Sequence, residues 1–325
     1  MSVINLEQAS KGLLDFHNHS TYSDGGDTPS QLVERAKEYG VSAMALTDHH
    51  VIGGLPEFRN ACEELDILGI PFGTEIGVEL PQEILEEGDN DSPDMVILGR
   101  NPRNVEAKIQ EYQAILQEDR ANRFLPETFE RMIERGFDIP RLPSDIKTAN
   151  PERLNELTED LKRNMAKGEN LGKLIDYIHS VDSSIRREDI EEQPGKYANK
   201  FFAIGQPGYV KRLEGFSLSD AKTLSEAMNC KLGIAHPGGE YGFLSDSVLY
   251  HMIEKGTHII ETRNYFNTPE QNVRFDKIAG EHNLTRSGGS DCHGDNSPFK
   301  IGMYDRPQNQ VPKEVLEELW ESLPE

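Results

Sequence analysis

The chain has 325 residues, of which 57 are acidic and 34 basic, so its formal net charge is −23 at pH 7. A field of this sign repels long nucleic acid unless a basic patch overrides it, and no Lys/Arg-rich run is present. The acidity is interpreted mainly as a solvated surface, with adaptation to salt as the alternative. Because no run of about 18 apolar residues occurs, the sequence predicts no transmembrane helix and no membrane partner.

Targeting and cysteine signals point to the cytoplasm. The segment 1–11 lacks the basic-then-apolar order of a signal peptide. Cys62, Cys230 and Cys292 form neither a CxxC motif nor an even-numbered framework, which is typical of a reducing compartment. We therefore expect a cytoplasmic protein.

Short apolar runs alternate with amphipathic stretches in the first hundred residues. Thr28 can cap a helix that has Pro29 at its first position. The predicted strands here are Leu13–His17, Ala43–Leu46, Phe72–Ile76 and Met95–Leu98, and the predicted helices are Thr28–Tyr39 and Leu55–Leu68.

The same alternation returns after residue 210. Its predicted strands are Leu232–Ala235, His258–Thr262 and Leu284–Ser287, and its predicted helices are Leu218–Met228, Ser245–Glu254, Pro269–His282 and Val311–Leu323. Strand–helix alternation implies parallel strands with helical crossovers. Seven such strands favour an α/β fold of the distorted, TIM-like (β/α)7 barrel type over an open sheet.

The middle of the chain has few strand signals. Its predicted helices are Glu106–Gln117, Ala121–Arg135, Pro151–Arg163 and Leu171–His179. We therefore expect two domains, a barrel built from residues 1–100 and 210–325 and a mostly helical insertion at residues 101–209. Such an insertion could form a cap over one end of the barrel.

Histidines and carboxylates gather at the ends of the predicted strands. His17 and His19 are two residues apart, so both side chains point to one face of a strand. The other polar residues at strand ends are Asp24, Asp48, His49, His50, Glu75, His236, Glu261, Asp291 and His293. Six of the ten histidines fall in these few positions, and the carboxyl ends of parallel barrel strands converge on one mouth.

Each of these motifs alone has a structural explanation, because a single HxH, Asp-His or Ala-His-Pro is common in proteins without metals. Packing so many imidazoles and carboxylates into one mouth without a cation would be costly. Mixed imidazole and carboxylate ligands suit Zn, Mn or Fe. The set as a whole therefore predicts a centre of two to three divalent metal ions.

An ordered set of motifs resembles the PHP (polymerase and histidinol phosphatase) family. The motifs are LDFHNHSTYSDG at 14–25, LTDH at 46–49, GTE at 73–75, AHPG at 235–238 and GGSDCHG at 288–294. Within the family, the chain is similar to the free-standing branch of nucleoside 3′,5′-bisphosphate phosphatases and 5′-exonucleases of short RNA. The stretch QPGYV at 206–210 and the pair Arg120 and Arg123 support that branch.

The resemblance implies a distorted seven-stranded barrel with a trinuclear site. It assigns the first ion to His17, His19, Glu75 and Asp291, the second to Glu75 as a bridge and His236, and the third to Asp24, His49 and His293.

The chain departs from the family pattern at three places. Val96 stands where the family usually has a histidine, which leaves the second ion short of a ligand. Segment 172–175 does not match the family's histidine after Gly-Arg-Pro. His50 replaces an aspartate after the Asp-His pair, and it is either a ligand or an outer partner.

A water that bridges two ions becomes hydroxide near neutral pH and can attack phosphorus. We expect Asp48, His49, Glu75 and His236 to take part in catalysis, with Asp48 orienting His49 or a water. Arginine forks hold phosphates directionally, so Arg120, Arg123, Arg263 and His50 are candidates for substrate binding. A solvated surface charge is the alternative for each arginine.

The predicted function is that of a hydrolase, a metal-dependent phosphoesterase acting on a phosphorylated nucleotide or short oligonucleotide. One alternative is an amidohydrolase-type enzyme that cleaves a C–N or ester bond, although no lysine bridge occurs on the fourth strand. The other is a non-catalytic metal- and nucleotide-binding protein. The sequence leaves the leaving group, the metals and the oligomeric state open.

Overall fold

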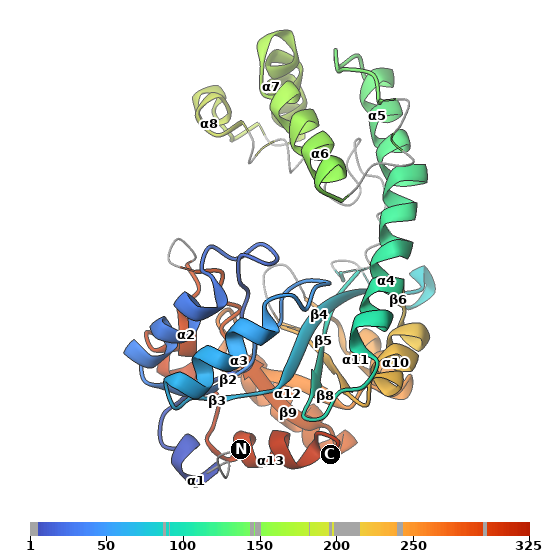
Figure 1. Ribbon diagram of the computed structural model, residues 1–325. Coiled ribbons are helices and arrows are strands. Elements are labelled where there is room, and N and C mark those ends of the chain that lie inside the picture. The colour runs from blue at the N-terminus through green and yellow to red at the C-terminus, as the bar shows by residue number, and fades with distance from the viewer. Residues whose placement is uncertain are drawn as a thin grey trace. The chain divides into compact units, whose positions relative to one another are not determined.

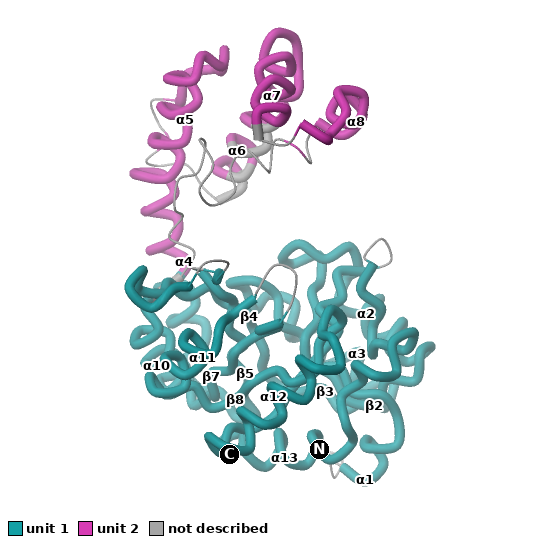
Figure 2. Tube along the Cα trace, turned by 180° about the vertical axis from the view of Figure 1, so that it is seen from behind, with its two compact units in different colours: residues 1–112, 214–325 teal, residues 113–213 magenta. Residues whose placement is uncertain are grey.

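The computed structural model describes residues 6–86, 89–90, 92–143, 146, 151–181, 183–194, 197, 215–238, 243–294 and 298–325. The QPGYV stretch at 206–210 lies outside the described residues. The chain divides into two compact units, one of Met1–Tyr112 with Glu214–Glu325 and one of Gln113–Leu213 (Figure 2). Within the described part of the chain, no helix is long and apolar enough to cross a bilayer.

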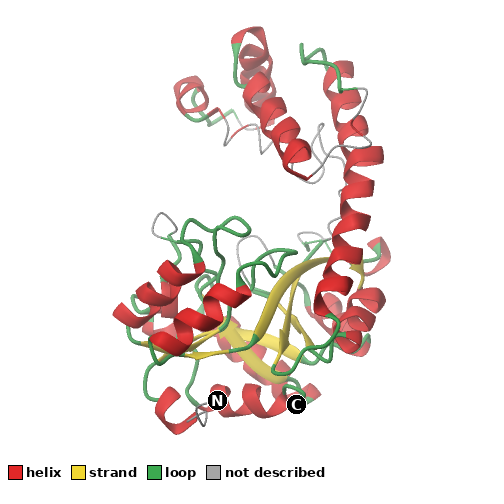
Figure 3. Ribbon diagram, viewed as in Figure 1, coloured by secondary structure: helices red, strands yellow, loops and turns green. Residues whose placement is uncertain are grey.

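Two sheets form the centre of the first unit (Figure 3). The smaller sheet is parallel, in the order β1 (Leu13–Asp15), β2 (Val41–Met44) and β3 (Leu68–Gly69). The larger has the order β6-β4-β5-β7-β8-β9. Its strands are β4 (Phe72–Glu79), β5 (Asp94–Gly99), β6 (Gly215–Ser217), β7 (Lys231–Ile234), β8 (Ile259–Asn264) and β9 (Thr285–Gly289).

All seven predicted strands are present, but the predicted closed barrel is wrong, because the strands form two separate sheets. The expectation of parallel strands also fails at β5, which is antiparallel to both β4 and β7. Between β4 and β5 the described residues hold only one 3₁₀ turn, Gln82–Ile84. Parallel neighbours need a long crossover, usually a helix, so this connection returns the chain antiparallel. Strands β3 and β6 were not predicted, because runs of two and three residues carry no periodic pattern.

The two sheets meet where their strands end. Isolated bridges pair Asn18 with Cys292 and His49 with Glu75. Gly289 allows the close approach of β9 to the residues after β1, because a Cβ there would lie 2.4 Å from the backbone nitrogen of His17. The Gly288–Gly289 pair ends β9.

Helices cover the sheets of the first unit. They are α1 (Leu6–Ala9), α2 (Pro29–Glu38), α3 (Leu55–Glu64), α10 (Leu218–Ala227), α11 (Asp246–Glu254), α12 (Pro269–His282) and α13 (Glu314–Ser322). Helices α2 and α3 pack on each other and against β2 and β3, while α12 and α13 pack against β8 and β9 (Figure 1). The predicted cap of α2 is confirmed, because the Thr28 side chain accepts the Gln31 N–H in a capping box.

The second unit has its own hydrophobic core. Helix α4 (Val105–Asp119) begins in the first unit and continues into the second, where a π-helical turn (Arg120–Phe124) leads into α5 (Leu125–Glu134). Helices α6 (Pro151–Met165), α7 (Gly168–Val181) and α8 (Arg187–Glu192) follow. Phe129, Leu154 and Leu174 belong to one buried cluster. A unit with a core of this kind can behave as a domain of its own.

Candidate metal centre

The strand ends of both sheets bring all eight predicted metal ligands together. His17 and His19 follow β1, His49 follows β2, Glu75 lies in β4, His236 follows β7, and Asp291 and His293 follow β9. With Asp24, these side chains form three groups whose ligand atoms lie within 4.8 Å of one another. The groups are His17, His19 and Asp291; His17, Glu75 and His236; and His19, Asp24, His49 and His293.

The first group surrounds one point between β1 and β9. His19 Nε2 lies 3.1 Å from Asp291 Oδ1 and 3.1 Å from His17 Nε2. The distance from His17 Nε2 to Asp291 Oδ1 is 3.6 Å. Two imidazoles and a carboxylate that converge with their lone-pair atoms suit a divalent transition-metal ion.

Glu75 lies between the groups and turns its two oxygens to different histidines. Its Oε1 lies 3.1 Å from His236 Nε2. Its Oε2 lies 3.2 Å from His17 Nε2, 3.3 Å from His19 Nε2 and 3.2 Å from His49 Nδ1. A carboxylate placed in this way could bridge two ions.

The third group is more open to solvent. Asp24 Oδ1 lies 3.3 Å from His293 Nε2, and Asp24 Oδ2 lies 3.8 Å from His49 Nε2. The His19 ring stacks between the other two imidazoles, with centroids 4.5 Å from His49 and 4.3 Å from His293. The Asp24 side chain is 57% exposed, so this group is the one that solvent reaches most readily.

The charges of the cluster fit a cation. Burial tends to lower the pKa of His19, but Asp291 and Glu75 outweigh it and raise that pKa to about 10. Burial also opposes ionisation of Glu75, yet His17 and His49 hold its pKa well below the usual range. Glu75 Oε2 and His19 Nδ1 are buried without a hydrogen bond of acceptable geometry. Buried polar atoms normally have partners, so these atoms suit coordination to a cation.

Glu261, to which its sequence position assigned no role, contacts two of the candidate ligands. Its Oε1 accepts a 2.8 Å hydrogen bond from His17 Nδ1, and its Oε2 accepts the backbone N–H of His236, also at 2.8 Å. Metal-binding histidines commonly donate their other ring nitrogen to a carboxylate, which fixes the ring. The sequence feature that could have indicated this contact is the position of Glu261 near the end of the predicted apolar strand at 258–262.

Asp15 is a second residue beside the candidate metal centre that the sequence motifs did not single out. Its carboxylate accepts hydrogen bonds from the N–H and hydroxyl of Ser290 and from the N–H of Gly302. Burial raises the pKa of Asp15 to about 6 even though these bonds oppose the rise. The contacts hold the turn that leads to Asp291. An acidic residue inside the apolar run of β1 was the signal.

Asp48 makes a contact that the sequence did not indicate. Its carboxylate accepts hydrogen bonds from the Ser20 N–H at 2.6 Å and from the hydroxyls of Ser20 and Ser23, both at 2.7 Å. Asp48 therefore holds the loop that joins His19 to Asp24.

The backbone is strained at three residues in or beside the candidate metal centre. The φ values of His50, His236 and Asp291 are positive, at 58°, 24° and 58°.

The residues expected to bind substrate are spread over both units. In the second unit, Arg120 donates to the Leu154 carbonyl, and Arg123 pairs with Asp119 at 2.7 Å. In the first unit, Arg263 pairs with Asp276 at 2.7 Å. His50 lies next to the cluster, where burial and the neighbouring His49 lower its pKa to about 4.

Val96 lies beside the cluster. The antiparallel register of β4 and β5 places Val96 opposite Glu75, and Val96 is fully buried. Residues that face each other across such a pair project to the same side of the sheet. An apolar side chain therefore stands next to the Glu75 and His236 group.

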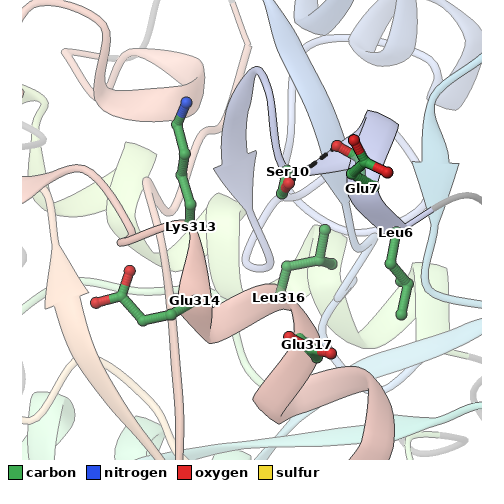
Figure 4. A pocket seen from close by; sticks show the side chains of 7 residues that line it. All are labelled: Leu6, Glu7, Ser10, Lys313, Glu314, Leu316 and Glu317. Atoms are coloured by element: carbon green, nitrogen blue, oxygen red, sulfur yellow. Dashed lines mark hydrogen bonds between the residues drawn. The ribbon is translucent and has the colours of Figure 1, made fainter.

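A cavity of about 370 Å³ lies elsewhere, between α1 and α13 (Figure 4). Its lining residues are Leu6, Glu7, Ser10, Lys313, Glu314, Leu316 and Glu317. None of the clustered histidines belongs to it, so its chemistry is separate from that of the candidate metal centre.

Fold and site together define an α/β protein with a buried histidine–carboxylate centre. The PHP domain family matches residues 15–147. The Escherichia coli 5′-3′ exoribonuclease Rnm is 22% identical over 320 residues, covering 93% of this chain and 97% of that protein. The 3′,5′-nucleoside bisphosphate phosphatase of Chromobacterium violaceum is 26% identical over 290 residues, covering 86% and 87%.

Other similarities are shorter or structural. An error-prone DNA polymerase of Mycobacterium tuberculosis is 39% identical over 90 residues, which are 27% of this chain and 8% of the polymerase. The solved structure of a protein proposed to be a metal-dependent phosphoesterase, from Bifidobacterium adolescentis, has a TM-score of 0.62 at 23% identity and covers 96% of both chains. The chain thus resembles PHP domain phosphoesterases, with the family match lying at residues 15–147.

Proposed function

We propose that the protein hydrolyses a phosphate ester of a nucleotide or short oligonucleotide with two to three divalent ions, Mn, Zn or Fe. The proposal rests mainly on the placement of Glu75, whose two carboxylate oxygens face different histidines in adjoining ligand groups. One carboxylate shared in this way suits ions a few ångströms apart, the arrangement used in two-metal phosphoester hydrolysis. The proposed cytoplasmic location agrees with three free cysteines.

The ligand sets follow the three groups. His17, His19, Asp291 and Glu75 would hold one ion, Glu75 and His236 a second, and Asp24, His49 and His293 a third. Bound ions lower the pKa of a coordinated water and neutralise phosphate oxygens. Glu261 keeps His17 and the His236 backbone in place, and Asp48 keeps the Ser20–Ser23 loop in place.

Three observations favour a small nucleotide as substrate. Two distant relatives that align over most of the chain carry the names of a nucleoside bisphosphate phosphatase and an exoribonuclease. The net charge of −23 disfavours a long duplex. Phe299 packs edge-on against His293 with a centroid distance of 6.2 Å, and aromatic rings near a phosphate site can stack on a base.

A second phosphate needs cations outside the ligand set. The candidates for this role are Arg120 and Arg123 in the helical unit and Arg263 in the first unit. Each already pairs with a protein group, so substrate phosphate would have to compete with Leu154, Asp119 or Asp276. These pairs would also hold the guanidinium groups in position before substrate arrives.

A non-catalytic nucleotide-binding role is the second candidate, and Val96 is the observation that favours it. An apolar side chain opposite Glu75 supplies no donor atom to the group formed with His236. An incomplete second position would leave a protein that binds metal and phosphate without turnover.

The test is phosphate release from adenosine 3′,5′-bisphosphate by Mn-loaded protein. We expect release by the wild-type protein and by His251→Ala, a control on α11, but not by His19→Ala. If none of the three proteins releases phosphate, yet calorimetry shows that the nucleotide binds, the non-catalytic candidate replaces the proposed function.

A further inference from the structure

His50 is held tightly beside the metal ligands, although it belongs to none of the three groups. Its backbone lies in the left-handed region at φ 58°, which is unfavourable for a residue other than glycine. Its N–H donates a 2.8 Å hydrogen bond to the carbonyl of Glu75. The backbone of His50 is thus tied to that of Glu75, the residue whose carboxylate lies between the ligand groups.

Tyr112 contacts the side chain of His50 from helix α4. Its hydroxyl lies 3.0 Å from His50 Nδ1, and the two ring centroids are 5.4 Å apart. Tyr112 is 0% exposed and His50 is half-buried, so this polar contact is partly shielded from solvent. A hydrogen bond of this kind restricts both the ring orientation and the position of the imidazole proton.

The direction of this bond follows from acidity. A phenol is a stronger acid than a neutral imidazole N–H, and an imidazole nitrogen is a stronger base than a phenol oxygen. This difference favours donation of the Tyr112 O–H to His50 Nδ1. A neutral imidazole carries only one proton, so that proton would then lie on Nε2. An Nε2–H cannot ligate a metal ion, but it can donate a hydrogen bond.

We propose that Tyr112 is a positioning residue that holds His50 as the Nε2–H tautomer, in which His50 donates a hydrogen bond to a phosphate oxygen of the substrate. The substrate contact rests on the proposed function, whereas the tautomer does not. Under this proposal His50 is a donor to substrate rather than a metal ligand. Loss of the Tyr112 hydroxyl would release Nδ1, and the proton could then exchange between both ring nitrogens.

The test compares Tyr112→Phe with Tyr265→Phe, a matched control. The control also removes one phenol hydroxyl from a mostly buried ring, but that hydroxyl bonds Asp305. Nitrogen-15 shifts of the histidine rings in metal-free protein report which nitrogen of His50 is protonated, with His50→Ala used for assignment. Calorimetry on Zn-loaded protein then measures the affinity for inorganic phosphate. The double variant Tyr112→Phe/His50→Ala completes a double-mutant cycle with the two single variants.

We expect Nε2–H in the wild-type protein and in Tyr265→Phe, and a mixture of tautomers in Tyr112→Phe. Phosphate should bind about tenfold more weakly to Tyr112→Phe, as expected for the loss of one hydrogen bond. It should bind equally to His50→Ala and to the double variant, because Tyr112 acts only through His50.

A proton on Nδ1 in the wild-type protein would overturn the proposal, as would an unchanged tautomer in Tyr112→Phe. An unchanged phosphate affinity in Tyr112→Phe would overturn the substrate contact. So would a double variant in which Tyr112→Phe weakens phosphate binding as much without His50 as it does with His50. These measurements need no turnover. The positioning role can therefore stand even if adenosine 3′,5′-bisphosphate is not cleaved.

Discussion

Glu261 and His17 form a fully buried pair in which Glu261 Oε1 accepts a 2.8 Å hydrogen bond from His17 Nδ1. The residues are 244 positions apart in sequence. The bond leaves Nε2 as the coordinating atom of His17, turned toward His19, Glu75 and Asp291. The pair thus connects the middle of β8 to the candidate metal centre.

Glu261→Gln should weaken metal binding while the protein stays folded. The amide keeps the shape of the side chain but loses the negative charge that raises the basicity of His17. Losing such an outer partner typically costs 10–100-fold in metal affinity. Zn titration against a competing chelator measures the change, with Glu254→Gln on α11 as the exposed control. Equal affinity in both variants would show that the pair has no influence on the metal.

Metal binding should release protons and strengthen as pH rises. Carboxylate neighbours outweigh burial and raise the pKa values of His19 to about 10 and of His236 to about 9, so both rings are protonated near neutral pH in metal-free protein. Ligating imidazoles must lose that proton, and the affinity should therefore rise from pH 6 toward pH 9. Calorimetry in two buffers of different ionisation enthalpy counts the released protons. Identical heats in both buffers would contradict this expectation.

Val96→His should add a donor beside Glu75 and His236. The register places residue 96 opposite Glu75, and the closely packed site makes a larger polar side chain costly in metal-free protein, by about 1–3 kcal/mol. Bound Zn should more than restore this loss of stability. Melting temperatures with and without Zn measure both effects, and Val96→Leu controls for volume without a donor. A His variant that Zn stabilises no more than the Leu variant would exclude residue 96 as a ligand position.

The three thiols should be unreactive in the folded protein. Burial raises the pKa values of Cys62, Cys230 and Cys292 to about 12, so little thiolate exists at pH 8. A disulfide reagent such as DTNB should modify none of them within minutes at pH 8, and should modify all three after unfolding in guanidinium. Rapid reaction of a thiol without denaturant would show that its segment opens readily.

Many members of the candidate cluster could be predicted because their signals are local. The HxH spacing predicts that His17 and His19 share a face, although β1 itself ends at Asp15, and the motif ends carry Asp24, Glu75 and Asp291 in the order that the PHP resemblance requires. The structure brings these side chains together in the predicted neighbourhood. These positions could be recognised because each motif depends only on residues close to one another in the sequence.

Contacts between distant segments could not be predicted in this way. The bonds of Glu261 to His17, of Asp48 to Ser20 and of Tyr112 to His50 join residues that no local period relates. Each contact depends on the path that the intervening segments take through the fold. Sequence periodicity does not specify that path.

The sequence by itself determined where seven of the described strands lie, which polar residues stand near their ends and which family they resemble, because backbone period and side-chain chemistry are local properties. Only the tertiary structure decided that β5 runs antiparallel, that the strands form two sheets and that Glu75 faces several histidines at once. The physical reason is that strand pairing depends on the path of the intervening chain and on close packing, as at Gly289 against His17.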